Sequence, residues 1–128
     1  MSILELSVVI VVAISLMTLL FIGARGWKRG SDRASCIMNI RQVQQAVRNY
    51  SATHQYYPGQ DVTPHVRGGS LYLQLVGAGK YVEEVPVCQQ GGVYENEGNI
   101  VPRIGELYMS CSLATDDADH KPEDHRDW

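Results

Sequence analysis

The chain begins with a long apolar run that carries no charged side chain. Residues 6–24 read LSVVIVVAISLMTLLFIGA, and their only polar members are Ser7, Ser15 and Thr18. As an α-helix, a run of this length spans about 28 Å, close to the hydrocarbon thickness of a bilayer. The run starts just after Glu5 and no small-residue cleavage site follows it. We therefore predict a retained membrane helix rather than a signal peptide.

Beyond Ser31 the apolar positions fall on a single helical face. Their spacing of four, three, four and three residues is typical of an amphipathic helix. The stripe consists of Cys36, Ile40, Val43, Val47 and Tyr50. We predict one helix over residues 1–54, made of a membrane or filament-core segment (1–24) and an amphipathic half (31–54). Arg41 and Arg48 are expected to point away from the stripe.

Three glycines lie between the two halves of this helix. Gly23, Gly26 and Gly30 fall within eight residues, and each costs about 1 kcal/mol in a helix interior relative to alanine. They mark either a place where the helix bends or unwinds, or a linker.

The rest of the chain is polar and rich in glycine, and it predicts a small globular head over residues 55–113. Pro58 ends the long helix. A short helix is expected over 70–76, with Ser70 as N-cap and Gly77 as C-cap. Three strands are expected, over residues 92–97, 99–104 and 107–112. The predicted fold class is α+β, in which the C-terminal half of a long N-terminal helix packs against a small antiparallel sheet.

Charge is distributed unevenly along the sequence. Residues 1–54 carry six basic and two acidic side chains, whereas residues 55–128 carry five basic and twelve acidic ones. A basic stem with an acidic head suits regular packing of stems. The basic patch lies beside the apolar run without interleaved aromatic residues, so we predict no nucleic-acid partner.

The three cysteines, Cys36, Cys88 and Cys111, form no C-x-x-C pair. A head this small benefits from a covalent link, so we favour a disulfide between Cys88 and Cys111. It would contribute about 3 kcal/mol and imply an oxidising compartment. Three reduced core cysteines are the alternative. Cys36 is expected to pack under the head, with a crosslink to another subunit as the rarer interpretation.

The tail, residues 114–128, is too acidic and too poor in apolar residues to fold by itself. It offers cation ligands but no recognised spacing, so we favour a solvated tail and predict no metal or other cofactor. The side chains concerned are Asp116, Asp117, Asp119, His120, Asp124 and His125. Catalytic motifs are also missing from the sequence, and the chain is not predicted to be an enzyme.

Glu5 is the residue on which the functional interpretation depends. An acid beside an apolar run is costly to bury unless it is paired. No basic side chain precedes Arg25, and Glu5 lies one helical turn from the α-amino group of Met1. The amine of a neighbouring chain is the natural counter-charge, and this pairing would fix the register between stacked copies.

Several segments resemble type IV pilins and the pseudopilins of type II secretion systems. MSILELSVVI at residues 1–10 is similar to their mature N-terminus, with an acid at the fifth position before an apolar helix. SCIMNIRQV at 35–43 and YYP at 56–58 resemble the family's helix and helix exit. VPVCQQGGVY at 85–94, with Cys111-Ser112, resembles the head of small pseudopilin-like proteins.

This resemblance implies a homo-oligomeric helical filament, extracellular as a pilus or periplasmic as a pseudopilus. It also implies an inner-membrane precursor, cleavage by a prepilin peptidase, N-methylation of Met1, and extraction by an ATPase-driven assembly machinery. The family's basic leader is not in the sequence, so Met1 is either the processed first residue or an initiator. The usual proline in the apolar helix is missing. The alternative function is a monomeric periplasmic binding domain on a single membrane anchor.

Overall fold

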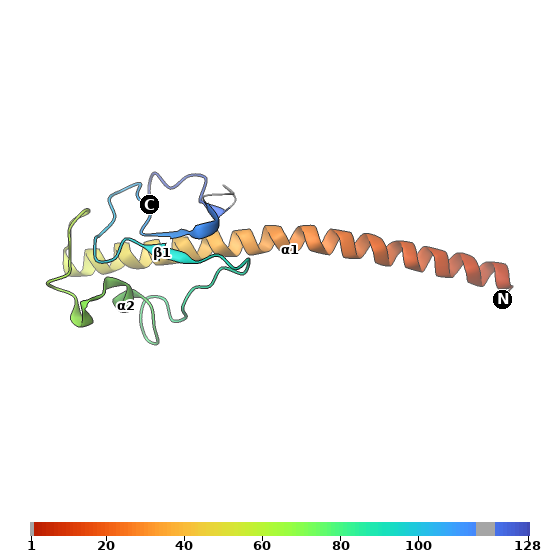
Figure 1. Ribbon diagram of the computed structural model, residues 1–128, viewed down its shortest axis with the longest axis horizontal. Coiled ribbons are helices and arrows are strands. Elements are labelled where there is room, and N and C mark those ends of the chain that lie inside the picture. Colours follow the sequence, from red (N-terminus) through yellow and green to blue (C-terminus); the bar gives the residue numbers. More distant parts are fainter. Residues whose placement is uncertain (1, 115–119) are drawn as a thin grey trace. The chain divides into compact units, whose positions relative to one another are not determined.

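The computed structural model describes residues 2–114 and 120–128 (Figure 1). The chain divides into two compact units, residues 1–32 and 33–128. Its helices and strands follow the order α1 (Ile3–His54), η1 (Arg67–Gly69), α2 (Leu71–Leu75), β1 (Tyr94–Asn96), β2 (Met109–Cys111) and η2 (Ser112–Ala114), where η denotes a 3₁₀ helix. The fold is α+β, as predicted: a long N-terminal helix packs against a small antiparallel sheet.

The predicted long helix is confirmed, and α1 runs without interruption for 52 residues. It passes through Gly23, Gly26 and Gly30, so the structure shows no unwound segment at these glycines. The helix ends where Gln55 adopts a left-handed conformation, with φ of 58°. The N–H of Tyr56 then donates to the Ser51 carbonyl at 2.9 Å, which is the bond of a Schellman cap. Pro58 follows and prevents the helix from resuming.

The apolar stripe on the C-terminal half of α1 forms the centre of the core. Every predicted member of the stripe is buried: Cys36, Ile40, Val43, Val47 and Tyr50. The head supplies the covering side chains, among them Leu71, Leu75, Val101 and Tyr108. The 3.6-residue periodicity therefore identified the face that packs.

The sheet has two strands rather than the three expected. β1 and β2 are antiparallel, and Tyr94 lies opposite Cys111. The expected strand over residues 99–104 is wrong, because this segment pairs its backbone with the loop after α1 instead. Val62 N–H donates to the Asn99 carbonyl at 2.9 Å, and Gly59 N–H donates to the Val101 carbonyl at 2.7 Å.

The short helix α2 is confirmed, but its caps differ from the prediction. Ser70 occupies the N-cap position without a side-chain capping bond. Asn99 takes this role from across the chain, since its Oδ1 accepts the Leu71 N–H at 2.8 Å. At the other end Val76, rather than Gly77, is the C-cap residue.

Arg48 contradicts the expectation that it would point away from the packed face. Its guanidinium is partly buried and donates to the carbonyls of Arg103 at 2.8 Å and Trp128 at 2.7 Å. Arg41 stays exposed and places its guanidinium carbon 5.6 Å from the centroid of the Trp128 ring. These contacts arise because the chain covers this side of α1 as well.

The described part of the tail, residues 120–128, contacts the head through some of its side chains. His120 and Pro122 are buried, and Trp128 packs against the core. The expectation of a solvated tail therefore fails for His120, Pro122 and Trp128, while the charged acidic and basic side chains of this segment stay exposed. Asp116, Asp117 and Asp119 lie outside the described residues.

Candidate functional site

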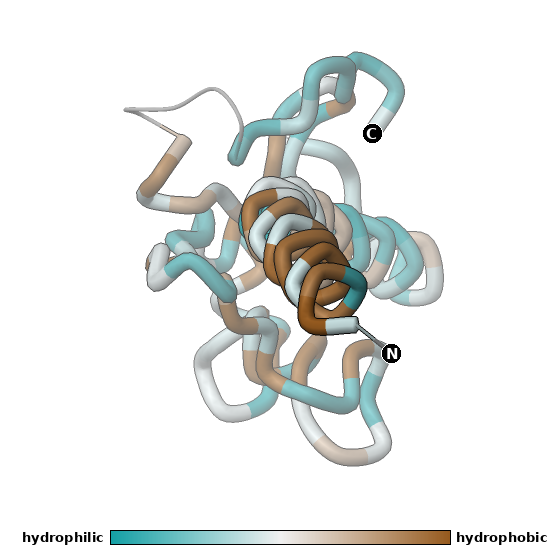
Figure 2. The backbone as a smooth tube through the Cα atoms, turned by 90° about the vertical axis from the view of Figure 1, so that its right-hand side faces the viewer, coloured by the Kyte–Doolittle hydropathy of each residue, from teal (hydrophilic) through white to brown (hydrophobic). Residues whose placement is uncertain are grey.

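The first unit presents its apolar side chains to the surroundings. Residues 2–31 are all exposed, and Ile3, Phe21 and Trp27 keep 88%, 72% and 80% of their surface accessible. Hydrophobic colouring dominates the N-terminal turns of the chain (Figure 2). By length and composition α1 is apolar enough to cross a membrane. Contiguous apolar surface of this extent marks a site that lipid or protein covers.

Glu5 takes part in a capping box at the start of α1. The Ser2 N–H donates to Glu5 Oε2 at 3.2 Å, and the Glu5 N–H donates to Ser2 Oγ at 3.4 Å. The S-x-x-E spacing at residues 2–5 is the sequence signature of this capping box. Glu5 therefore has a role within its own chain. Met1 lies outside the described residues, so its pairing with Glu5 and its N-methylation stay predictions.

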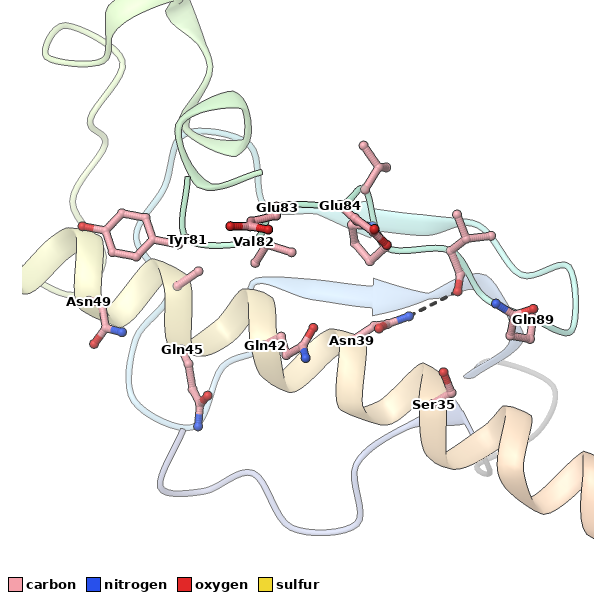
Figure 3. A pocket seen from close by; sticks show the side chains of 14 residues that line it. Ser35, Asn39, Gln42, Gln45, Asn49, Tyr81, Val82, Glu83, Glu84 and Gln89 are labelled. Carbon is pink, nitrogen blue, oxygen red and sulfur yellow. Dashed lines mark hydrogen bonds between the residues drawn. The ribbon is translucent and has the colours of Figure 1, made fainter. Parts of the chain in front are cut away.

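A polar groove of about 520 Å³ lies along one side of α1 in the second unit (Figure 3). Asn39 points across it from α1, and its Nδ2 donates to the Val87 carbonyl at 3.2 Å. Glu83 and Glu84 contribute exposed carboxylates from the opposite wall. The other polar side chains of the lining are Ser35, Gln42, Gln45, Asn49, Tyr81 and Gln89. This lining offers hydrogen bonds to a polar surface rather than an oriented nucleophile.

Cys88 and Cys111, the residues of the predicted disulfide, lie close together in the core. Both are buried, and both are unbridged thiols in the structure. Cys36 and His120 join them, and the four donor atoms all lie within 4.8 Å of one another. The predicted disulfide is therefore untested, but its two residues are neighbours. Sequence reasoning placed Cys36 under the head correctly and did not connect it with His120.

The four members of this cluster come from four separate segments. Cys36 lies on α1, Cys88 follows Pro86 in a loop, Cys111 ends β2, and His120 belongs to the C-terminal segment. The pairing of β1 with β2 places Cys111 opposite Tyr94. The hydroxyl of Tyr94 in turn donates to the Cys36 carbonyl at 3.5 Å. This contact joins the helix to the strand that faces Cys111.

The environment acts differently on the three thiols. Burial raises the pKa of the Cys36 thiol to about 12. Burial also raises the pKa of the Cys111 thiol, although the backbone N–H of Leu113 acts to lower it. At Cys88 burial opposes ionisation, but the backbone N–H groups of Gln90 and Gly92 and the neighbouring thiols outweigh it and lower the pKa. Cys88 is therefore the thiol whose ionised form the surrounding hydrogen bonds favour.

The other described cation candidates of the tail do not converge on one site. His125 Nδ1 lies 2.8 Å from the Gly105 carbonyl oxygen. Asp124 forms an exposed ion pair with Arg126 at 2.9 Å. Of the two tail histidines, only His120 reaches a set of metal-binding atoms in the described residues.

Comparisons with protein-family models, with curated proteins and with solved structures find no match for this chain. The resemblance to type IV pilins therefore rests on the sequence motifs and on the architecture. A long apolar N-terminal helix with a small antiparallel sheet is compatible with that family.

Proposed function

We propose that this chain is a structural subunit of a helical filament of the type IV pilin kind. It polymerises through the apolar N-terminal part of α1, and Glu5 pairs with the N-terminal amine of a neighbouring copy. The observation that carries the proposal is an acid, Glu5, at the start of an apolar helical surface that nothing in the described chain covers.

This apolar surface is stable only where lipid or protein covers it. Each large apolar side chain that moves from water into a packed environment contributes about 1.5–3 kcal/mol. Val8, Leu16 and Leu20 are 54%, 57% and 73% exposed in the single chain. A lipid bilayer covers such side chains before assembly, and neighbouring copies of α1 cover them in a filament. The apolar surface therefore suits a membrane helix and a filament core equally, and by itself it does not distinguish between them.

The carboxylate of Glu5 distinguishes a filament from a simple anchor. In a bundle of helices this group is removed from water, and an unpaired buried charge costs several kcal/mol. Within the described chain Glu5 accepts through Oε2, which leaves Oε1 for a donor from another copy. An amine placed there satisfies the charge in only one stagger of the two chains. Pairing thus fixes the axial register of the subunits.

The proposal includes the cellular route that the resemblance implies. The subunit resides in an inner membrane before assembly, is processed by a prepilin peptidase and N-methylated on Met1, and is extracted by assembly machinery. The filament is then either an extracellular pilus or a periplasmic pseudopilus of a secretion system.

A membrane-anchored monomer that binds a ligand is the second candidate, and the polar groove beside Asn39 favours it. The groove gives the head a surface that hydrogen-bonds a partner without any need for stacked copies. On this alternative Glu5 has only its capping role. The two functions therefore differ in what the charge on Glu5 does.

The test compares Glu5→Gln with the matched variant Ser2→Ala. Glutamine keeps a carbonyl oxygen for the Ser2 N–H, so Glu5→Gln removes the charge and retains the capping box. Ser2→Ala removes the bond from Glu5 N–H to Ser2 Oγ, at a cost of about 1 kcal/mol, and keeps the charge. Filaments are scored by negative-stain electron microscopy and membrane insertion by fractionation.

We expect Glu5→Gln to insert into the membrane normally and to lose filaments about 100-fold or more, because breaking a buried charge pair costs about 3–5 kcal/mol. Ser2→Ala should still assemble. Filaments of normal abundance from Glu5→Gln, or an equal loss in both variants, would refute the pairing. A native chain that stays a membrane monomer and is found in no filament would instead support the anchored alternative.

A further inference from the structure

The cluster of Cys36, Cys88, Cys111 and His120 has the dimensions of a tetrahedral metal site. His120 Nδ1 lies 3.7 Å from Cys88 Sγ and 3.8 Å from Cys111 Sγ. A zinc ion with Zn–S of about 2.3 Å and Zn–N of about 2.0 Å requires S···N edges of about 3.5 Å and S···S edges of about 3.8 Å. Movements of a few tenths of an ångström bring the imidazole to these distances. All four donor atoms lie within 4.8 Å of one another, so shifts of up to about 1 Å would bring the remaining pairs to these distances.

All four side chains of the cluster are buried, which separates them from an accidental surface grouping. Cys36 is 0% exposed, His120 is 2% exposed, and Cys88 and Cys111 are each 3% exposed. Three thiolates with one imidazole form a recognised structural zinc set, and a tetrahedral arrangement of soft donors selects zinc over hard cations.

Gln90 orients the imidazole of His120. The Nε2 atom of His120 lies 2.8 Å from Gln90 Oε1. Because the amide oxygen accepts, Nε2 carries the proton, and the lone pair of Nδ1 faces the sulfur atoms. Metal-binding histidines regularly donate their other N–H to an oxygen in this way. His120 is thus held in the tautomer that ligation through Nδ1 requires.

Gly92 leaves the space that the sulfur atoms occupy. A Cβ added at this position would lie 2.5 Å from Cys111 Sγ and 3.2 Å from Cys88 Sγ. The backbone thus approaches the two sulfurs as closely as only glycine permits.

We propose that Cys36, Cys88, Cys111 and His120 bind one zinc ion as a structural site in the head. The ion ties together α1, the loop after Pro86, the end of β2 and the C-terminal segment. This link explains how a tail with so few apolar residues stays on the head, since metal binding contributes directly to folding. The site lies in the second unit and does not depend on the proposed filament.

The zinc site and the predicted disulfide differ in whether they require Cys36 and His120. A Cys88–Cys111 disulfide uses two of the four side chains and needs neither of the others. Zinc needs all four. Cys36→Ser and His120→Asn therefore distinguish the two. His125→Asn is the matched control, because His125 belongs to the same segment and contacts the Gly105 carbonyl instead.

The experiment uses the full chain, purified in detergent under reducing conditions without chelators. Elemental analysis measures bound zinc, and titration with Co²⁺ reports tetrahedral thiolate coordination through its visible and charge-transfer absorption. We expect one zinc per chain, and a Co²⁺ spectrum typical of three thiolates in a tetrahedral site. Cys36→Ser and His120→Asn should weaken Co²⁺ binding by about 100-fold or more, whereas Gln90→Ala should weaken it about 10- to 100-fold. His125→Asn should bind normally.

Substoichiometric zinc together with no cobalt–thiolate absorption in the wild-type chain would overturn the site, whether or not the variants fold. So would a Cys88–Cys111 linkage in the freshly isolated native chain, detected by peptide mass spectrometry without reduction. Because the measurement uses dispersed chains in detergent, a loss of filaments has no bearing on its result.

Discussion

Replacing Gln44 by alanine should destabilise the head far more than the same change at its neighbour Gln45. Gln44 is buried, with 2% of its surface exposed, and its side-chain amide pairs with the backbone beside β2. Its Nε2 donates to the Glu106 carbonyl at 2.9 Å, and its Oε1 accepts the Tyr108 N–H at 2.8 Å. One side chain on α1 thus serves the donor and the acceptor of an adjacent stretch of backbone, much as a neighbouring strand does.

The magnitude follows from the groups that the substitution leaves without partners. Tyr108 is fully buried, so its N–H cannot recover the lost bond from water. A buried polar group left unsatisfied costs about 1–3 kcal/mol. Glu106 is exposed, so water can hydrate its carbonyl at a lower free-energy cost. With the cavity left by the side chain, we expect Gln44→Ala to lower the free energy of unfolding by about 2–4 kcal/mol.

Chemical denaturation of the full chain in detergent measures this difference. Near-UV circular dichroism reports the head, because Tyr50, Tyr94 and Tyr108 lie in or against its core. For a folded unit near 100 residues, a change of 1 kcal/mol shifts the melting temperature by about 4–8 °C. Gln44→Ala should therefore melt at least about 8 °C below the wild type. Gln45 is exposed, and Gln45→Ala should stay within about 0.5 kcal/mol.

A Gln44→Ala variant as stable as Gln45→Ala would refute this account of how α1 holds the head. An additional comparison with Gln44→Leu separates the lost hydrogen bonds from the lost volume. If the leucine variant regains full stability, packing rather than polar satisfaction governs the position.

Two further predictions concern glycine space and alkaline stability. Gly92→Ala should lower the free energy of unfolding of the head by about 1–3 kcal/mol, because the added Cβ overlaps the Cys111 sulfur. An added Cβ at Gly26 meets nothing within 4 Å, so Gly26→Ala should raise the helical stability of α1 by up to about 1 kcal/mol. Equal effects of the two changes in denaturation experiments would contradict the close approach at Gly92. Burial raises the pKa of the Tyr108 hydroxyl, so the folded state holds its proton more tightly, and stability should fall as pH rises above the ordinary tyrosine value of about 10. Tyr108→Phe should flatten that alkaline decline in pH-dependent unfolding curves, and an unchanged slope would show that another group causes it.

The long helix and its packed face could be predicted because their signals are local. The spacing of Cys36, Ile40 and Val43 is set by the helical repeat, whatever the head looks like. The capping box of Ser2 and Glu5 was equally local and could have been recognised from S-x-x-E.

The remaining features depend on contacts between distant parts of the chain. Residues 99–104 have the composition of a strand, yet their backbone partners are set by where the loop after α1 passes. The sequence predicts Arg48 at the surface, but in the folded chain its guanidinium donates to the carbonyls of Arg103 and Trp128. His120 sits in an acidic tail without any local motif, and only the folded chain brings it to three cysteines from other segments.

The distribution of exposure along α1 has a consequence for how such a sequence can change over time. Side chains 2–31 are exposed, while buried ones begin at Cys36 on the same continuous helix. A substitution in the first stretch leaves the core of the head intact, and a repacked head leaves the first stretch chemically as it was. One helix therefore carries two independently adjustable surfaces. Substitutions that suit the first stretch to a thicker bilayer or a different neighbour therefore require no compensating substitutions in the head.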